Sequence, residues 1–351
     1  MAIKRRRNPQ FLSLALSCQR HVKREGSVWP RPQARRDRHP RWSSPGYPCG
    51  PNALIAADFN GDGKLDLAVG SLRYACSGEL SVLLGNGDGI FQSPVTYTAG
   101  GQSIGIVAAD FNGDGKLDLA VADERFSGYS SPGSVAVLFG KGDGTFQSPI
   151  TFAVGVQPSA LSSGDFNGDG RVDLITSNSG GDTVTVLLSD GDGTFKRVDS
   201  STGTAFPGFL TIGDFNGDGK MDAVVVTSYS NLIILLVYIP LGNGDCTFTS
   251  EVNTPLPATL YIGPVAVADL NGDGKADVIA YESTSSGQQL AVELGKGDGT
   301  FQNAITTSIG SATLSPMLTG DFNGDGKADV AGINGQSLSV LPGNGDGTFG
   351  A

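Results

Sequence analysis

Oxygen-bearing side chains recur at fixed spacing in this sequence, in a nine-residue stretch that occurs six times. The first copy, Asp58–Asp66, reads D-F-N-G-D-G-K-L-D. Its carboxylate and amide side chains stand at positions 1, 3, 5 and 9, and the glycines at positions 4 and 6 allow the backbone to curl with positive φ. Carboxylate, amide and carbonyl oxygens in a flexible loop are the ligands that Ca²⁺ prefers. We therefore expect each copy to bind one calcium ion.

All six copies keep these ligand types without exception. Asn-Gly and Asp-Gly pairs also form metal-free hairpin turns, which is the alternative interpretation, but a turn alone needs no aspartate at positions 1 and 9. The predicted ligands are the side chains at positions 1, 3, 5 and 9 and the backbone carbonyl at position 7: Asp58, Asn60, Asp62, Lys64, Asp66, Asp110, Asn112, Asp114, Lys116, Asp118, Asp165, Asn167, Asp169, Arg171, Asp173, Asp214, Asn216, Asp218, Lys220, Asp222, Asp269, Asn271, Asp273, Lys275, Asp277, Asp321, Asn323, Asp325, Lys327 and Asp329.

The start of each copy resembles an EF-hand calcium loop, but the residues after it do not. The glutamate expected at position 12 is absent, and β-branched or small apolar residues come in its place. Such residues favour a strand rather than the second helix of an EF-hand. We therefore place each loop between two strands.

The acidity of the chain is concentrated in these loops. Residues 1–50 carry 12 basic and 2 acidic side chains, whereas residues 51–351 carry 12 basic and 33 acidic ones, giving a net charge of −11. Of the 33 acidic residues, 18 are aspartates of the six loops. We interpret the acidity as a metal-site signature, and it argues against nucleic acid as a partner of residues 51–351.

Apolar segments flank each loop and must hold it in place. A predicted strand such as 54–57, 106–109 or 265–268 precedes the loop, and a second strand comes after it. A third, such as 80–84 or 135–139, leads into a second signature, G-x-G-D-G-x-F, whose Asp-Gly pair predicts a hairpin. A fourth strand, such as 95–99 or 150–154, completes the unit. Copies of the second signature lie at Gly85–Phe91, Gly140–Phe146, Ser189–Phe195, Gly242–Phe248, Gly295–Phe301 and Gly343–Phe349.

This plan repeats with a period of about 50 residues, since the first aspartates of successive loops are 52, 55, 49, 55 and 52 residues apart. Four short antiparallel strands in a unit of that length are typical of a β-propeller blade. We predict an all-β chain with a propeller of about six or seven four-stranded blades over residues 51–351. The apolar run 232–239 is too short to span a bilayer, so we expect no transmembrane segment.

The two signatures together resemble the FG-GAP/VCBS repeat and are similar to the N-terminal propeller of integrin α subunits. The resemblance covers about residues 51–351. It implies calcium in the hairpin between the first two strands of each blade, and an extracellular or cell-surface setting. The integrin-type propeller has seven blades, whereas this chain shows six loops and its last repeat stops before a fourth strand. We expect either that six blades close with a strand from around Trp42–Asn52 or that the chain is a fragment.

Residues 1–50 share nothing with the repeats. Four basic residues at 4–7 followed by the apolar run 11–17 have the order of a secretory signal, but no A-x-A cleavage site comes after them. The alternatives are a disordered basic tail or a wrongly assigned start codon. Four scattered cysteines do not make a disulfide framework, although Cys49 and Cys76 could pair.

Binding is expected on the face opposite the calcium loops, because rigid scaffolds present variable loops to their ligands. We predict a monomeric, secreted or surface-exposed scaffold for a protein or carbohydrate ligand, with structural calcium. Candidate ligand-binding residues in the variable loops are Arg73, Tyr74, Arg125, Phe126, Tyr129, Tyr229 and Tyr281.

Catalysis finds little support, because both histidines, His21 and His39, lie outside the repeats and leave no histidine base there. The chain is therefore predicted not to be an enzyme. The alternative is a propeller-type polysaccharide lyase or hydrolase, or a non-catalytic module of one. A third hypothesis is that the basic segment directs the protein to an anionic surface.

Overall fold

The computed structural model describes residues 13–15, 50–72, 78–123, 132–202, 206–229, 232–240, 248–255, 261–312, 314, 316–334 and 337–350. All regular structure within these ranges is β-strand, as the period-two patterns predict. The same ranges contain no helix of the length and apolar character needed to cross a membrane.

The strands form six antiparallel sheets, each made from consecutive segments of the chain. The first sheet contains β1 (Ser13–Ala15), β2 (Gly50–Ala57), β3 (Asp66–Leu72), β4 (Glu79–Leu83) and β5 (Val95–Thr98). The second contains β6 (Ser103–Ala109), β7 (Asp118–Asp123), β8 (Pro132–Leu138) and β9 (Ile150–Val156). The third contains β10 (Pro158–Gly164), β11 (Asp173–Asn178), β12 (Thr183–Ser189) and β13 (Phe195–Ser201).

The remaining three sheets repeat this order. The fourth contains β14 (Pro207–Gly213), β15 (Asp222–Tyr229), β16 (Leu232–Pro240) and β17 (Phe248–Pro255). The fifth contains β18 (Tyr261–Ala268), β19 (Asp277–Thr284), β20 (Gly287–Glu293) and β21 (Ile305–Gly310). The sixth contains only β22 (Met317–Gly320), β23 (Asp329–Asn334) and β24 (Ser337–Leu341).

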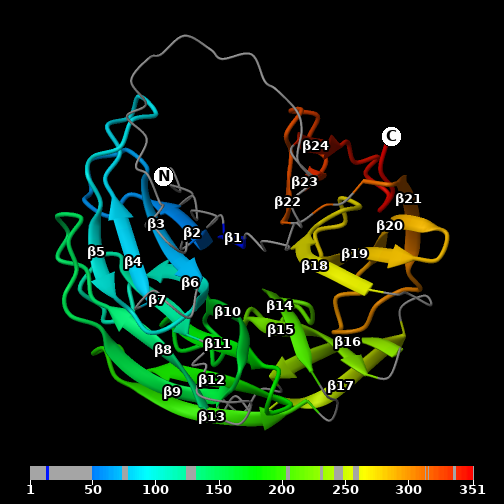
Figure 1. Cartoon of the computed structure of the whole chain (residues 1–351). Coiled ribbons are helices and arrows are strands. Elements are labelled where there is room, and N and C mark those ends of the chain that lie inside the picture. The colour runs from blue at the N-terminus through cyan, green and yellow to red at the C-terminus, as the bar shows by residue number, and fades with distance from the viewer. Residues whose placement is uncertain are drawn as a thin grey trace, which may run out of the picture.

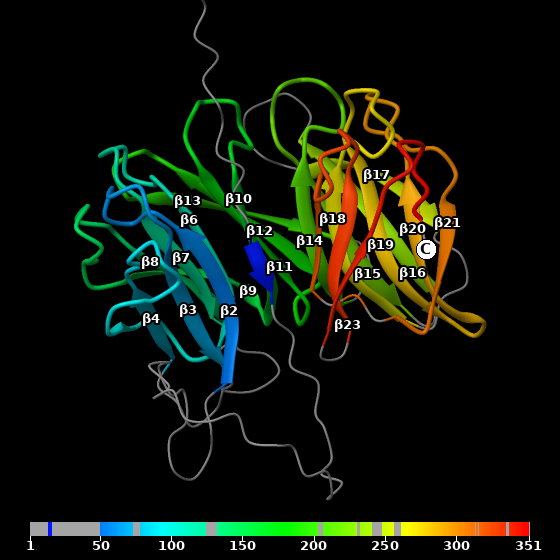
Figure 2. The same cartoon turned by 90° about the horizontal axis from the view of Figure 1, so that it is seen from above.

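The sheets stand around a common centre like the blades of a propeller (Figure 1). The first strand of each repeat lies innermost, and β2, β6, β10, β14, β18 and β22 contact one another in that order around the centre. The later strands of each repeat lie farther out. The view turned by 90° shows the propeller from its edge, with β2–β4 on one side of the molecule and β19–β21 on the other (Figure 2). The predicted propeller architecture is therefore confirmed.

The number of blades differs from the predicted six or seven four-stranded blades. Five sheets have four or more strands and form complete blades, while the sixth has three. In the sixth sheet, β24 is the last strand that the structure describes, and it leads into a hairpin closed by the bridge between Gly343 and Phe349. The predicted closing strand around 42–52 is not found in the sixth sheet either. Its residues 50–52 belong to β2 of the first sheet, and 42–49 lie outside the described residues.

The hydrophobic core lies between neighbouring sheets rather than within any one of them. The cluster between the first and second sheets, for example, joins Ile55 and Leu80 to Ile106 and Leu138. Equivalent clusters lie between the second and third, third and fourth, fourth and fifth, and fifth and sixth sheets. Each blade is therefore stabilised mainly by the blades on either side of it, as expected for a repeat architecture.

Several predicted features of the first 76 residues fall outside the described residues. These are the signal-like segment, apart from β1 within its apolar run, and the pairing of Cys49 with Cys76. They stay predictions.

Candidate functional site

Each nine-residue loop is folded around the aspartate at its first position. In the first copy, Asp58 Oδ1 accepts hydrogen bonds from the amides of Gly61 at 2.8 Å and Asp62 at 3.1 Å, and its Oδ2 accepts one from Gly63 at 2.8 Å. The bonds from the two glycine amides recur in all six copies. The glycines at positions 4 and 6 have φ of 73° and 81° in the first copy, a region that side chains with a Cβ rarely adopt.

The middle of the loop is held by two further side-chain oxygens. Asn60 Oδ1 accepts the amide of Asp62 at 2.9 Å, and Asp62 Oδ1 accepts the amide of Lys64 at 2.9 Å. The same pair of bonds is present in the other five copies. Positions 1, 3 and 5 therefore turn their oxygens toward the backbone of their own loop.

The aspartate at position 9 has a different role, because it joins the two signatures of a blade. Asp66 is fully buried; its Oδ2 accepts the amide of Phe59 at 2.9 Å, and its Oδ1 accepts the amide of Gly85 at 2.7 Å. Equivalent pairs of bonds, at 2.8–3.1 Å, are made by Asp118, Asp173, Asp277 and Asp329. Each of these carboxylates links the nine-residue loop to the second hairpin of the same blade.

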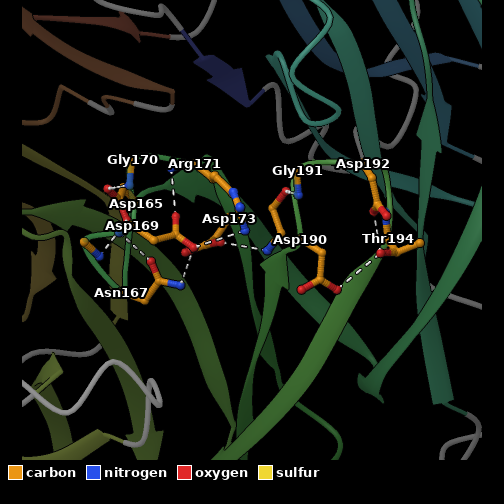
Figure 3. A network of polar contacts seen from close by, with 12 residues as sticks. Asp165, Asn167, Asp169, Gly170, Arg171, Asp173, Asp190, Gly191, Asp192 and Thr194 are labelled. Atoms are coloured by element: carbon orange, nitrogen blue, oxygen red, sulfur yellow. Dashed lines mark hydrogen bonds and ion pairs between the residues drawn. The ribbon is translucent and has the colours of Figure 1, made fainter.

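Figure 3 shows this arrangement in the third blade, where the loop from Asp165 to Asp173 lies beside the hairpin that carries Asp192 and Thr194. Asp192 Oδ1 accepts both the amide of Thr194 at 2.9 Å and its hydroxyl at 2.6 Å. Those bonds lower the pKa of Asp192, with the hydroxyl bond as the largest cause. The repeated Asp-Gly-Thr turn thus stabilises its own hairpin.

A cation stands at position 7 of every loop. Lys64 Nζ lies 3.3 Å from Asp62 Oδ2, and equivalent pairs join Lys116 to Asp114 at 3.5 Å and Lys275 to Asp273 at 3.6 Å. The aliphatic part of the side chain crosses to the neighbouring hairpin: a Cβ added to Gly87, whose φ is +82°, would lie 3.0 Å from Lys64 Cδ. One basic side chain therefore partly offsets the three carboxylates of its loop.

Burial changes the ionisation of the ninth-position carboxylates. Loss of hydration raises the pKa of Asp118 and Asp173 to about 6 and that of Asp222 to about 7, against the lowering effect of their amide hydrogen bonds. The carboxylates at positions 1 and 5 of the same loop raise it further. Asp222 differs from the others in that its Oδ1 has no hydrogen-bond partner among the residues that the structure describes.

The donor set of each loop fits Ca²⁺ in its chemistry. It consists of three carboxylates, one amide oxygen and one backbone carbonyl, all oxygen ligands in a loop that glycines keep adaptable. Each carboxylate oxygen that accepts one amide proton keeps a second lone pair. Across the described ranges, however, no group of three or more acidic, histidine or cysteine side chains is gathered closely enough to hold a metal ion. Calcium ligation by the residues predicted above therefore stays a prediction.

Most of the predicted ligand-binding residues lie outside the part of the chain that the structure describes. These are Arg73, Tyr74, Arg125, Phe126 and Tyr129, while Tyr229 is described only as the last residue of β15. Tyr281 is placed differently from the prediction: it lies within β19, is 5% exposed, and its hydroxyl donates to Gln288 Oε1 at 2.8 Å. The expected loop 281–288 is shorter, because β19 extends to Thr284 and β20 begins at Gly287.

The sequence reasoning missed two buried carboxylates between the fourth and fifth sheets. Glu282 is fully buried, with one oxygen accepting the side-chain amide of Gln289 at 2.7 Å. Glu293 is 2% exposed, and within the described part of the chain neither of its oxygens has a hydrogen-bond partner. Burial raises the pKa of both, that of Glu293 to about 8, and the charge of Glu282 contributes to the latter. The sequence did carry a signal for them: Glu282 and Glu293 occupy strand positions that alternate with apolar residues.

Comparison with solved structures shows the same fold in distant proteins. A lectin from Agrocybe aegerita that recognises non-reducing terminal N-acetylglucosamine is 21% identical, with a TM-score of 0.57 over 85% of this chain and 78% of that chain. A protein from Lactobacillus plantarum is 14% identical, with a TM-score of 0.55 over 80% of each chain. None of the curated proteins compared with this chain matches it.

The family model for the FG-GAP-like repeat matches four segments, residues 58–121, 123–176, 165–225 and 214–280. Each segment runs from one nine-residue loop, or from just after it, to the end of the next loop or beyond. The family match therefore has the same period as the structural repeat. Together the segments cover well over half of the chain, and the protein belongs to the FG-GAP-like repeat family.

Proposed function

We propose that this protein is a calcium-stabilised β-propeller that acts outside the cell as a binding scaffold for a glycan or protein, and that it is not an enzyme. The observation that carries the proposal is the sixfold repetition of one complete oxygen donor set on a rigid frame. A single loop of this kind would be weak evidence, whereas six copies that keep every ligand type favour a common ion.

Calcium would be held by positions 1, 3, 5 and 9 and the carbonyl of position 7, and it would supply charge neutralisation. In the first loop Asp58, Asp62 and Asp66 carry three negative charges, which Lys64 only partly offsets. Extracellular modules of this chemistry bind Ca²⁺ at about 10⁻⁴–10⁻³ M. Loops with an affinity in that range would be filled only where calcium is abundant, which is why the proposal places the protein outside the cell.

The opposite edge of the blades is where we place ligand binding. The antiparallel strand order puts the nine-residue loops and the second hairpins at one edge, and the turns between second and third strands at the other. Those turns and the connections between blades vary in length and sequence, as expected of a surface that sets specificity. Since one solved propeller of this fold recognises N-acetylglucosamine, glycans are the first ligand class to test.

Two measurements test the proposal. Calorimetric titration of the metal-free chain with Ca²⁺ is expected to give about six sites, Asp62→Ala is expected to remove one, and Asp88→Ala in the second hairpin is expected to remove none. A glycan array probed with the calcium-loaded chain should then identify a ligand. Absence of calcium binding would end the metal part of the proposal, and turnover of a polysaccharide by the purified chain would contradict the non-enzymatic role.

A further inference from the structure

Three residues other than glycine have positive φ in the part of the chain that the structure describes, and all three lie at one edge of the third blade. They are Gln157 with φ of 51°, Asp182 with φ of 51° and Phe206 with φ of 60°. Gln157 directly precedes β10, Asp182 lies in the turn between β11 and β12, and Phe206 directly precedes β14. This edge is opposite the nine-residue loop of the blade, because β10 runs from it to Asp165.

Hydrogen bonds connect the three residues through the turn between β11 and β12. The carbonyl of Gln157 accepts the amide of Ser179 at 2.8 Å and its hydroxyl at 3.1 Å. The carbonyl of Asp182 accepts the amide of Thr202 at 2.9 Å and its hydroxyl at 3.0 Å. Asp182 Oδ1 accepts the amide of Phe206 at 3.0 Å. Gln157, Asp182 and Phe206 therefore form one connected group, which we call the third-blade edge cluster.

The backbone at Gln157 and Phe206 is unfavourable for the residue that each position carries. Positive φ brings a side chain with a Cβ into steric conflict with its own backbone. Each of the two residues also directly precedes a proline, which favours an extended conformation instead. In two other places where one blade leads to the next, glycine takes the positive φ: Gly100 at 118° and Gly310 at 66°. Glycine would fit both positions of the cluster with less strain.

Folding does not account for the ring of Phe206. This side chain is 62% exposed, so it buries little apolar surface that would offset the strain of its backbone. It is the one large apolar side chain that the described part of residues 156–226 exposes. Strained residues that the fold itself does not need cluster at sites that bind ligands.

The segment that carries Phe206 is held firmly on the third blade. Ser159 Oγ donates to the carbonyl of Pro207 at 2.7 Å, and Pro207 is buried. Ser177 Oγ donates to the carbonyl of Gly208 at 3.1 Å. Together with the bond to the amide of Phe206, these contacts fix the backbone from which the ring projects. An aromatic side chain on a fixed backbone loses little conformational entropy when it binds a ligand.

Two polar side chains of the cluster have hydrogen-bonding capacity left over. Asp182 is exposed, and among the described residues its Oδ2 accepts no hydrogen bond. The side-chain amide of Gln157 makes none within the same part of the chain. This amide lies over Gly180, since a Cβ added to that glycine would be 2.6 Å from Gln157 Oε1. A carboxylate oxygen, a primary amide and an exposed ring are thus available at one edge of the blade.

We propose that the third-blade edge cluster binds a neutral pyranose of a glycan. The face of an aromatic ring carries negative potential, against which the C–H groups on one face of a pyranose would pack at Phe206. The sugar hydroxyls would donate to Asp182 Oδ2 and exchange hydrogen bonds with the amide of Gln157. The charge of Asp182 would disfavour uronic acids and other anionic sugars. The inference rests on the proposed function and adds to it a place and a class of sugar.

A protein partner fits the cluster less well than a sugar does. Specific protein interfaces bury about 800 Å² on each partner, around several apolar or aromatic anchors. The cluster offers one exposed ring beside a carboxylate and an amide. That combination matches the small area and the high polarity of a single pyranose.

The first experiment measures binding by fluorescence anisotropy. The probes are end-labelled hexasaccharides of glucose, N-acetylglucosamine, mannose and galactose, and hexagalacturonate as the anionic counterpart, each titrated with the full chain in millimolar Ca²⁺. We expect a neutral probe to bind about tenfold or more tightly than hexagalacturonate, and Phe206→Ala to weaken that binding by about tenfold or more. The matched control is Phe322→Ala, which removes a 48% exposed ring from the sixth sheet and should leave binding unchanged.

A second pair of variants tests the carboxylate. Asp182→Asn keeps an acceptor for the amide of Phe206, but it replaces Oδ2 by a donor and removes the charge. It should weaken binding of the neutral probe and reduce the preference over hexagalacturonate. Asp88→Asn also changes an exposed aspartate that accepts a backbone amide, and it should alter neither quantity.

Phe206→Gly separates binding from folding. Glycine adopts positive φ without strain, so the melting temperature should stay the same or rise while binding is lost. Phe206→Trp should retain binding, because it keeps an aromatic face. A fall in melting temperature of several degrees in Phe206→Gly would show that the ring is needed for the fold, and would overturn the proposal.

The remaining outcomes distinguish the cluster from the proposed function. Loss of binding in Phe206→Ala and Asp182→Asn, with both controls unchanged, supports the proposal. Equal binding by the natural chain and by Phe206→Ala overturns it and places the glycan elsewhere on the scaffold. No binding of any neutral probe at millimolar concentration also overturns it, and leaves a protein as the ligand of the scaffold. Preference for hexagalacturonate would contradict the neutral class of sugar.

Discussion

Asp66 and Gly85 are joined by a hydrogen bond of 2.7 Å from the glycine amide to Oδ1 of the carboxylate, although 19 residues separate them. The bond links the loop between β2 and β3 to the hairpin between β4 and β5. The equivalent bond recurs in four other blades, with separations of 14–22 residues. Within a blade, a buried carboxylate that accepts two backbone amides therefore connects the nine-residue loop to the second hairpin.

Removing one of these carboxylate oxygens should destabilise the protein strongly. In Asp118→Asn the amide group keeps one acceptor and turns a donor toward the amide of either Phe111 or Gly140, so that one buried N–H loses its partner. We expect a loss of about 2–4 kcal/mol in the free energy of unfolding, measured in urea with chelator present. Asp88→Asn, which changes an exposed aspartate that accepts the amide of Ile90, should cost less than about 1 kcal/mol. An equal loss of unfolding free energy in the two variants would contradict this connecting role of the buried carboxylate.

The aromatic contact between blades predicts that two Phe→Ala substitutions, at Phe146 and at Phe322, lower the stability by different amounts. Phe146 is 4% exposed and packs edge to face on both Phe59 and Tyr97, whose hydroxyl also accepts the amide of Phe146 at 3.0 Å. Phe146→Ala should cost about 3–5 kcal/mol of stability. Phe322→Ala, in the sixth sheet, should cost less than about 1 kcal/mol because this side chain is 48% exposed. Chemical denaturation of both variants measures the contrast, and similar losses would show that Phe322 is covered in solution.

Stability should also depend on pH through Glu293. Its raised pKa means that the folded protein holds this proton more tightly than the unfolded chain does. The stabilisation is complete below the ordinary value of 4.5 and is lost as the pH rises through about 8. Glu293→Gln, which stays neutral, should raise stability by roughly 2–4 kcal/mol at pH 8.5 and change it little at pH 4.5.

Thermal melts across that range compare Glu293→Gln with Glu79→Gln, a change at an exposed residue of β4. The curve of the first variant should diverge from that of the natural chain with rising pH, while the second should run parallel to it. If Glu293→Gln lowers stability at every pH, the carboxylate has a partner in solution and the burial argument fails.

Much of the fold can be predicted from the sequence, because its signals are local. The apolar runs predicted the strands to within a few residues, as for 232–239 against the observed Leu232–Pro240. The Asp-Gly pairs predicted hairpins that the structure closes through bridges such as Gly140 to Phe146. The period then predicted the propeller, since four short antiparallel strands in about 50 residues are typical of a propeller blade.

The features that the sequence could not supply depend on contacts between distant segments. Asp66 looks like one ligand among four in the loop pattern, and only the pairing of β3 with β4 brings Gly85 to its second oxygen. Leu338 and Leu290 are equally apolar and occupy the same repeat position, yet one is exposed and the other buried. Leu290 is buried by the sixth sheet, whereas no described sheet packs over Leu338, and no local pattern encodes that difference.

The central claim, that calcium stabilises this propeller, is tested most directly by thermal unfolding of the full chain with millimolar Ca²⁺ and with excess chelator. At roughly ten times Kd each site adds about 1.4 kcal/mol, so six independent sites add about 8 kcal/mol. We predict a rise in melting temperature of about 10 °C or more with Ca²⁺ and a much smaller one with Mg²⁺, which demands a stricter octahedral site. Identical melting temperatures in calcium and in chelator would contradict the claim and leave the nine-residue loops as metal-free turns held by their own amides.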